Sequence, residues 1–285
     1  LRDLTRYRKA LINERTAQVN RIHKVLQDAG IKLTTYAADV MGVSGRAMMR
    51  ALIAGEADTA ALAELAKARM RTKIPNLRRA LTGRFGEHHA FLLKRMLNHV
   101  EAQEADIAAL DERIEAALAP FLAQVELLCT IPGVQIRSAQ AILAELGPDM
   151  AVFPTAAQLA SWAGMCPGQR DSAGKHGSGK TRKGSKWLRA ALVQSARSAS
   201  RTKGTYLSER YRQIMRRRGD AKAIVALGHE ILLSAYRVLD TGQPYIDPGP
   251  TALSRLTADR QRQQAIRRLQ NLGYHVTITP RTDAA

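Results

Sequence analysis

The helical architecture of this chain rests on residues 86–121, GEHHAFLLKRMLNHVEAQEADIAALDERIEAALAPF. A set of residues recurs there at alternating steps of three and four, so that all of them would lie on one face of a helix. They are Leu93, Met96, Val100, Gln103, Ile107, Leu110, Ile114, Ala117 and Phe121. That spacing predicts a coiled-coil seam held for about four heptads. Gln103 is its polar position, of the kind that sets register or oligomer state.

A seam of this kind needs a partner helix, and the sequence leaves two candidates open. Residues 1–29 predict one helix, because Ile12, Val19 and Ile22 share a face and Gly30 is a plausible stop. The partner of the seam is this helix folded back, the same seam of a second protomer, or both.

The charge of the chain limits its class of partner. Among 285 residues, Lys and Arg number 44 against 25 Asp and Glu, giving a formal charge of +19. The excess is spread along the chain and favours nucleic acid as the partner, with non-specific binding or a ribosome-like structural role as the alternative. No apolar run reaches the roughly 18 residues that span a bilayer. The two cysteines fit a reducing cytoplasm without a disulfide framework.

Residues 131–147, IPGVQIRSAQAILAELG, predict a tight Pro-Gly turn followed by a helix. The pattern is typical of the helix-hairpin-helix of DNA-handling proteins, in which the glycine turn and the next helix start hold one phosphate. Gly133 is therefore a candidate DNA contact. The alternative is an ordinary pair of helices without a ligand.

A glycine-rich basic loop follows within residues 163–191, AGMCPGQRDSAGKHGSGKTRKGSKWLRAA. It contains one serine of interest, Ser172, and leads into an apolar helix near Trp187. Its candidate DNA-binding cations are Arg170, Lys175, Lys180, Arg182, Lys183, Lys186 and Arg189. A basic loop that leads into a helix N-terminus suits phosphate, because free N–H groups and the helix dipole favour anions there. The alternative is a solvated basic loop.

Four segments in this order resemble the IS110 family of transposases, in particular the IS116/IS110/IS902-type C-terminal transposase domain. They are VMGVSGRAMMRALIAGE at 40–56, IPGV at 131–134, QLASWAGMCPGQRDSAGKHGSGKTRKGSKWLRAAL at 158–192, and LGHEILLSAYRVL at 227–239. The resemblance covers nearly the whole chain, and residues 128–195 are its most specific part.

The resemblance implies a DNA recombinase that works through a covalent serine–DNA intermediate, with a structured RNA choosing target and donor DNA. It makes Ser172 the nucleophile, although Ala173 intervenes before the glycine of the family's short motif. Nearby cations, with Arg170 and Lys175 among them, would then hold the phosphate. It also implies insertion-sequence ends and target DNA as partners, a dimer or tetramer, and a place at the nucleoid of a prokaryotic cytoplasm.

The family's metal site is not recognisable in this sequence. In the family, an N-terminal RuvC-like domain supplies the four acidic residues of that metal site. Asp171 and Glu145 are single carboxylates in this sequence, and we interpret Asp171 as a local cap and Glu145 as part of a solvated helix face. No Cys and His cluster has zinc spacing either, so no metal site is predicted in this chain. The chain begins at Leu1 in mid-helix pattern. We therefore expect Mg²⁺ to act through a missing domain, and the chain alone to bind nucleic acid without recombining DNA.

The expected fold is mainly α. Residues 1–122 would form a helical coiled-coil region, residues 123–245 a helical serine-bearing transposase domain, and residues 246–285 a basic tail. Trp162 is expected in the core. The alternative function is a non-catalytic helical nucleic-acid-binding module. A metabolic serine hydrolase fits poorly, since no nucleophile elbow or paired His and acid stands out.

Overall fold

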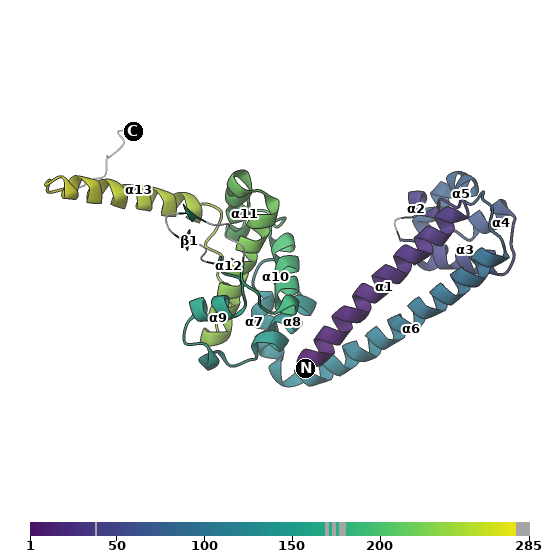
Figure 1. Cartoon of the computed structure of the whole chain (residues 1–285), viewed down its shortest axis with the longest axis horizontal. Helices are drawn as coiled ribbons and strands as arrows, with labels where there is room; N and C mark the ends of the chain where they lie inside the picture. The colour runs from purple at the N-terminus through teal and green to yellow at the C-terminus, as the bar shows by residue number, and fades with distance from the viewer. Residues whose placement is uncertain (38, 169–170, 173–174, 177–180, 278–285) are drawn as a thin grey trace. The chain divides into compact units, whose positions relative to one another are not determined.

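The computed structural model describes residues 1–37, 39–168, 171–172, 175–176 and 181–277, with the backbone alone at 171–172, 175–176 and 254–261. The described chain is mainly helical, which confirms the predicted fold class (Figure 1). It divides into two compact units. Unit 1 is Asp3–Ala117 together with Leu1, and unit 2 is Leu118–Ala285 together with Arg2.

Unit 1 has two long helices and, between them in the sequence, a group of short ones. In chain order they are α1 (Arg2–Asp28), α2 (Leu33–Tyr36), α3 (Val43–Ile53), α4 (Thr59–Glu64), the 3₁₀ helix η1 (Ala68–Lys73), α5 (Ile74–Ala80) and α6 (Glu87–Leu118). The short helices gather at the end of the α1–α6 pair that holds the C-terminus of α1 (Figure 1). Their shared core is apolar, and its fully buried side chains include Leu33, Met48, Met49, Leu62 and Leu77.

Helices α1 and α6 run antiparallel, and ion pairs mark their register. Arg8 of α1 pairs with Asp111 of α6, and Arg15 pairs with Glu104 at 2.6 Å. The seam partner present in the structure is therefore the N-terminal helix of the same chain, one of the two candidates. The predicted polar position Gln103 is buried in the seam at 4 % exposure.

Unit 2 is a bundle centred on α10 (Lys186–Ala199) and α12 (Asp220–Thr241). Its other elements in chain order are η2 (Ala119–Phe121), α7 (Leu122–Cys129), α8 (Ile136–Leu146), η3 (Met150–Val152), α9 (Ala156–Trp162), β1 (Asp171–Ser172), β2 (Lys175–His176), α11 (Tyr206–Arg218) and α13 (Ala252–Asn271). Helix α8 packs on α7 and α10, while α9 and α11 pack on α12. The buried face of α10 includes the small side chains of Ala191, Ser195 and Ala196, which suit close packing against its neighbours α8 and α12.

The turn between α7 and α8 packs closely on α10. Gly133 has φ +86°, and a Cβ on it would lie 2.4 Å from the carbonyl oxygen of Ser195 and 2.5 Å from the amide nitrogen of Ala199. A contact below 3 Å with backbone cannot be relieved by a side-chain rotation. This glycine is therefore required for packing, whatever ligand the turn binds.

The expectation that Trp162 lies in the core is wrong. Its side chain is 50 % exposed at the end of α9, and its ring lies 5.3 Å from that of Phe153. The helix buries Leu159 and Ala160 instead, so Trp162 falls on the outer side of the turn. No helix in the described part of the chain has a stretch long and apolar enough to cross a bilayer.

Candidate active site

The two ends of the glycine-rich loop lie close together where the loop leaves α9 and enters α10. Gly164 follows α9 with φ +66°, and Gly184 comes just before α10. A Cβ on Gly184 would lie 2.1 Å from the carbonyl oxygen of Ala163, and a Cβ on Gly164 would lie 2.8 Å from that of Arg182. Only glycines allow this approach, so the two ends of the loop are held against each other.

Arg189 of α10 ties the same two ends together. Its Nη1 donates to Thr181 Oγ1 at 2.7 Å, and its Nη2 donates to the carbonyl oxygens of Gly164 at 2.6 Å and Arg182 at 3.1 Å. An isolated antiparallel bridge between Pro167 and Thr181 adds to the closure. In the structure the guanidinium of Arg189 thus holds the base of the loop, and the DNA contact expected of Arg189 stays a prediction.

Between these ends the backbone forms a short antiparallel ribbon that carries the candidate nucleophile. Strands β1 and β2 pair with Asp171 opposite His176 and Ser172 opposite Lys175. The ribbon brings a serine and a lysine that are three positions apart into direct register. Arg170 and Lys180 lie outside the described residues, and Lys175 is described by its backbone alone, so their phosphate contacts stay predictions.

Three predicted cations lie where the loop enters α10. The side chains of Arg182, Lys183 and Lys186 are exposed, and the Nζ of Lys186 lies 4.9 Å from the ring centroid of Trp187. Among the described residues, no acidic side chain forms an ion pair with any of these three. Cations beside a helix N-terminus are unfavourable unless an anion joins them, because the dipole is positive there. The arrangement therefore suits a phosphate.

The start of α10 is fixed by a hydrogen-bonded pair of side chains. Ser185 caps the helix, since its Oγ accepts from the amide of Leu188 at 3.2 Å, and the same hydroxyl donates to Glu145 Oε2 at 2.8 Å. Glu145 is 2 % exposed at the end of α8. The prediction that it lies on a solvated helix face is wrong, because α7 and α10 both cover α8.

Sequence reasoning missed Glu145 and Ser185 as parts of the loop support. One signal was available: residues 138–146 of α8 are nearly all small or apolar, as expected of a helix covered on more than one side. A carboxylate within such a helix needs a donor, and Ser185 supplies one. The pairing partner itself lies 40 positions away and could not be read from local pattern.

The structure separates two groups of predicted contacts that the sequence could not place. Gly133 packs on Ser195 and Ala199, near the C-terminal end of α10, whereas the loop cations lie at its N-terminal end. At 1.5 Å per residue these regions are about 15 Å apart along the helix. Gly133 therefore does not share a single phosphate site with the described cations Arg182, Lys183 and Lys186.

The described residues offer no metal site. No group of three or more His, Cys, Asp or Glu side chains in the described part of the chain could hold a metal ion. Glu145, the nearest buried carboxylate to the loop exit, already binds Ser185. These described residues do not fit a divalent cation.

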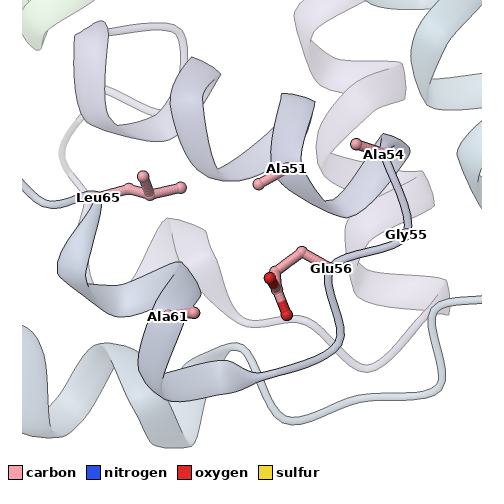
Figure 2. Close-up of a pocket in the computed structure, with 6 residues that line it drawn as sticks. All are labelled: Ala51, Ala54, Gly55, Glu56, Ala61 and Leu65. Atoms are coloured by element: carbon pink, nitrogen blue, oxygen red, sulfur yellow. The ribbon is translucent and has the colours of Figure 1, made fainter.

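Unit 1 contains a hollow of its own. The end of α3, the following turn and α4 line it, with small or apolar side chains and one carboxylate: Ala51, Ala54, Gly55, Glu56, Ala61 and Leu65 (Figure 2). The carboxylate of Glu56 accepts from the amide of Asp58 at 2.8 Å. The hollow brings together no cluster of charged side chains, since Glu56 is the one ionisable residue among those that line it.

Comparisons with known proteins match the region that holds the loop. Residues 125–212 match a family described as "Transposase IS116/IS110/IS902 family". A protein of Streptomyces coelicolor, described as "Insertion element IS110 uncharacterized 43.6 kDa protein", is 33% identical over 122 residues, which are 41% of this chain and 29% of that relative. The matched region thus spans less than a third of the relative's length.

Proposed function

We propose that this chain takes part in DNA transposition, with Ser172 as the nucleophile that becomes linked to DNA, because residues 125–212 match the transposase family described as IS116/IS110/IS902. The observation that supports this best is the loop itself. Two glycines and Arg189 close its base, and the ribbon within it carries Ser172 opposite Lys175. A rigid base with a nucleophile on a short ribbon suits a step that needs fixed geometry.

In the proposed step the Ser172 hydroxyl oxygen attacks the phosphorus of a DNA phosphodiester. A serine O–P bond forms, one P–O bond to deoxyribose breaks, and the released sugar hydroxyl takes up a proton while the serine loses its own. Attack by a second DNA hydroxyl on the phosphoserine reverses the exchange and joins new strands. The phosphodiester energy is kept in the intermediate, so no co-reactant is consumed.

The cations of the loop would hold the phosphate during this step. Charge builds on the non-bridging oxygens of phosphorus, and positively charged side chains fixed nearby stabilise it. Arg182, Lys183 and Lys186 are exposed at the N-terminus of α10 and available for this role. Arg170, Lys175 and Lys180 are proposed for the same role on sequence grounds alone.

Further parts of the proposal rest on the resemblance to the family. They are DNA ends and target DNA as substrates, a structured guide RNA that selects them, and assembly into a dimer or tetramer. The expected Mg²⁺ would be held by acidic residues other than the described ones, which do not fit it.

Trapping the covalent intermediate tests the proposal. The full-length gene product is mixed with labelled insertion-sequence DNA, guide RNA and Mg²⁺, and denatured samples are examined for a protein-linked label. We expect an adduct that Ser172→Ala abolishes while DNA binding is retained. Ser178→Ala, a change of the same kind within the same loop, is the control and should leave the adduct intact.

An adduct that survives Ser172→Ala would contradict the assignment of the nucleophile. Binding without an adduct in the unchanged protein would instead favour the alternative function, a non-catalytic helical nucleic-acid-binding module.

A further inference from the structure

We propose that residues 67–84 of unit 1, called here the basic segment, bind the phosphate backbone of a double-stranded nucleic acid. The segment covers η1, α5 and the turn that follows. It contains seven Lys or Arg residues and no Asp or Glu: Lys67, Arg69, Arg71, Lys73, Arg78, Arg79 and Arg84. In the rest of residues 3–117 acidic residues outnumber basic ones, so the positive excess of unit 1 lies in this segment.

All seven cations are on the outside. Each is exposed, while the apolar residues of the segment, Leu77 at 0 % and Leu81 at 3 % exposure, are buried in the unit 1 core. The segment thus has an apolar inner side and a basic outer side. In Figure 1 its helix α5 lies among α2, α3 and α4, at the end of the α1–α6 pair.

Both ends of the segment are fixed to the body of unit 1. At the start, the amide of Lys67 donates to Ser44 Oγ at 2.9 Å. At the end, the amide of Arg84 donates to the carbonyl oxygen of Ala29 at 2.7 Å, and a Cβ on Gly83 would lie 2.3 Å from that same oxygen. The cations are therefore presented from a held backbone, which lowers the entropy lost on binding.

A strained residue occurs at the start of the segment. Ala68 has φ +49°, the left-handed region that costs an L-residue about 1 to 2 kcal/mol. It turns the chain directly from Lys67 into η1. Strain of this kind persists only where the surroundings enforce it, and it is concentrated at functional positions.

Acidic neighbours neutralise little of this charge. Glu64 lies 3.4 Å from Arg71 and 3.5 Å from Arg78, but all three side chains are at least half exposed, where such pairs contribute little. Lys73 donates to the carbonyl oxygen of Tyr36 at 2.8 Å, which is not an acidic partner. Among the described residues, no acidic side chain pairs with the four remaining cations: Lys67, Arg69, Arg79 and Arg84.

The make-up of the segment favours a duplex over other polyanions. It contains no aromatic residue, so it offers no platform on which unpaired bases could stack. None of the exposed large apolar side chains lies within it, so it lacks the anchor of a protein interface. Charge without stacking or apolar contact is the chemistry of sequence-independent backbone binding.

The test measures binding of the full chain to short blunt duplexes of DNA and of RNA by fluorescence anisotropy, across a range of salt. A combined Arg69→Ala, Arg79→Ala and Arg84→Ala variant removes three contacts. We expect its affinity to fall at least about ten-fold and the slope of log affinity against log salt to decrease by about 2 to 3. The matched control combines Lys94→Ala, Arg95→Ala and Arg113→Ala, which removes the same charge from exposed positions on α6.

Whichever duplex, DNA or RNA, shows the larger loss of affinity in the first variant is the natural ligand of the basic segment. Equal losses in the two variants, or no loss in the first, would overturn the proposal. A second readout needs no variant: bound duplex should protect Lys67 from acetylation more than Lys94, and the reverse order would also overturn it. None of these measurements depends on Ser172, so failure of the covalent step would leave them unchanged.

Discussion

At the scale of single residues, two glycines with the same backbone angle have different jobs. Gly133 and Gly147 both have φ +86°, but a Cβ on Gly133 would meet the backbone of α10 at 2.4 Å, while a Cβ on Gly147 would meet nothing within 4 Å. The first glycine serves both conformation and packing, and the second serves conformation alone.

Replacing each of these glycines separates the two effects. We expect Gly147→Ala to lower the free energy of unfolding by about 1 to 3 kcal/mol, because a backbone with φ +86° and ψ 167° is essentially restricted to glycine. Gly133→Ala should cost about 3 kcal/mol or more, because α10 must also move away. Chemical denaturation of both variants measures the difference. Equal costs would show that the turn does not pack on α10 as described.

Arg189 can be tested as the residue that closes the loop base. Arg189→Ala removes three hydrogen bonds from a charged donor, and we expect a loss of about 2 kcal/mol and faster proteolytic cleavage within residues 165–183. Lys183→Ala is the control, since its exposed side chain forms no hydrogen bond among the described residues. If the control loop is cleaved as fast as the Arg189 variant, closure does not depend on the guanidinium.

At the scale of elements, one carboxylate links three helices of unit 1. Glu104 of α6 accepts from Arg15 of α1 at 2.6 Å and from Arg46 of α3 at 2.6 and 2.8 Å. Burial by itself would raise the pKa of Glu104, but the hydrogen bonds and charges of Arg46 and Arg15 outweigh it and the pKa is lowered. The charged form is therefore favoured in the folded state.

This lowered pKa predicts how the stability of unit 1 depends on pH. A carboxyl group with a depressed folded pKa contributes stability above its unfolded value of about 4.5, and that contribution is lost as pH falls through the folded pKa. Glu104→Gln should therefore flatten the loss of thermal stability below pH 4.5. The exposed Glu112→Gln is the control. If the Glu104→Gln variant loses stability in acid as steeply as the unchanged chain, the carboxylate does not have this role.

At the scale of the whole molecule, the two units have separate cores. Calorimetry should therefore resolve two unfolding transitions. Leu26→Ala removes a side chain buried in unit 1, and Leu227→Ala one buried in unit 2. Each should lower the stability of its own transition by about 2 to 5 kcal/mol and leave the other in place. A shift of both transitions by either variant would show that the units unfold together.

Much of the helical framework could be predicted because its signals are local. The seam positions Leu93, Val100 and Ile114 are buried, as their spacing indicates. A period of three and four residues places side chains on one helical face wherever that helix is packed. The sequence did not show which helix packs on α6. In the structure α6 packs antiparallel on α1, with contacts such as the ion pair of Arg15 and Glu104.

The helical class, the seam and the basic glycine-rich loop with its serine follow from the amino-acid sequence alone, since helix period, charge and glycine content are properties of short segments. The packed structure was needed to show that Arg189 closes the loop, that Glu145 is buried against Ser185, and that Gly133 lies at the far end of α10 from Arg182, Lys183 and Lys186. These depend on which helices cover one another, and hydrogen bonds between residues distant in the chain form only once that packing is set.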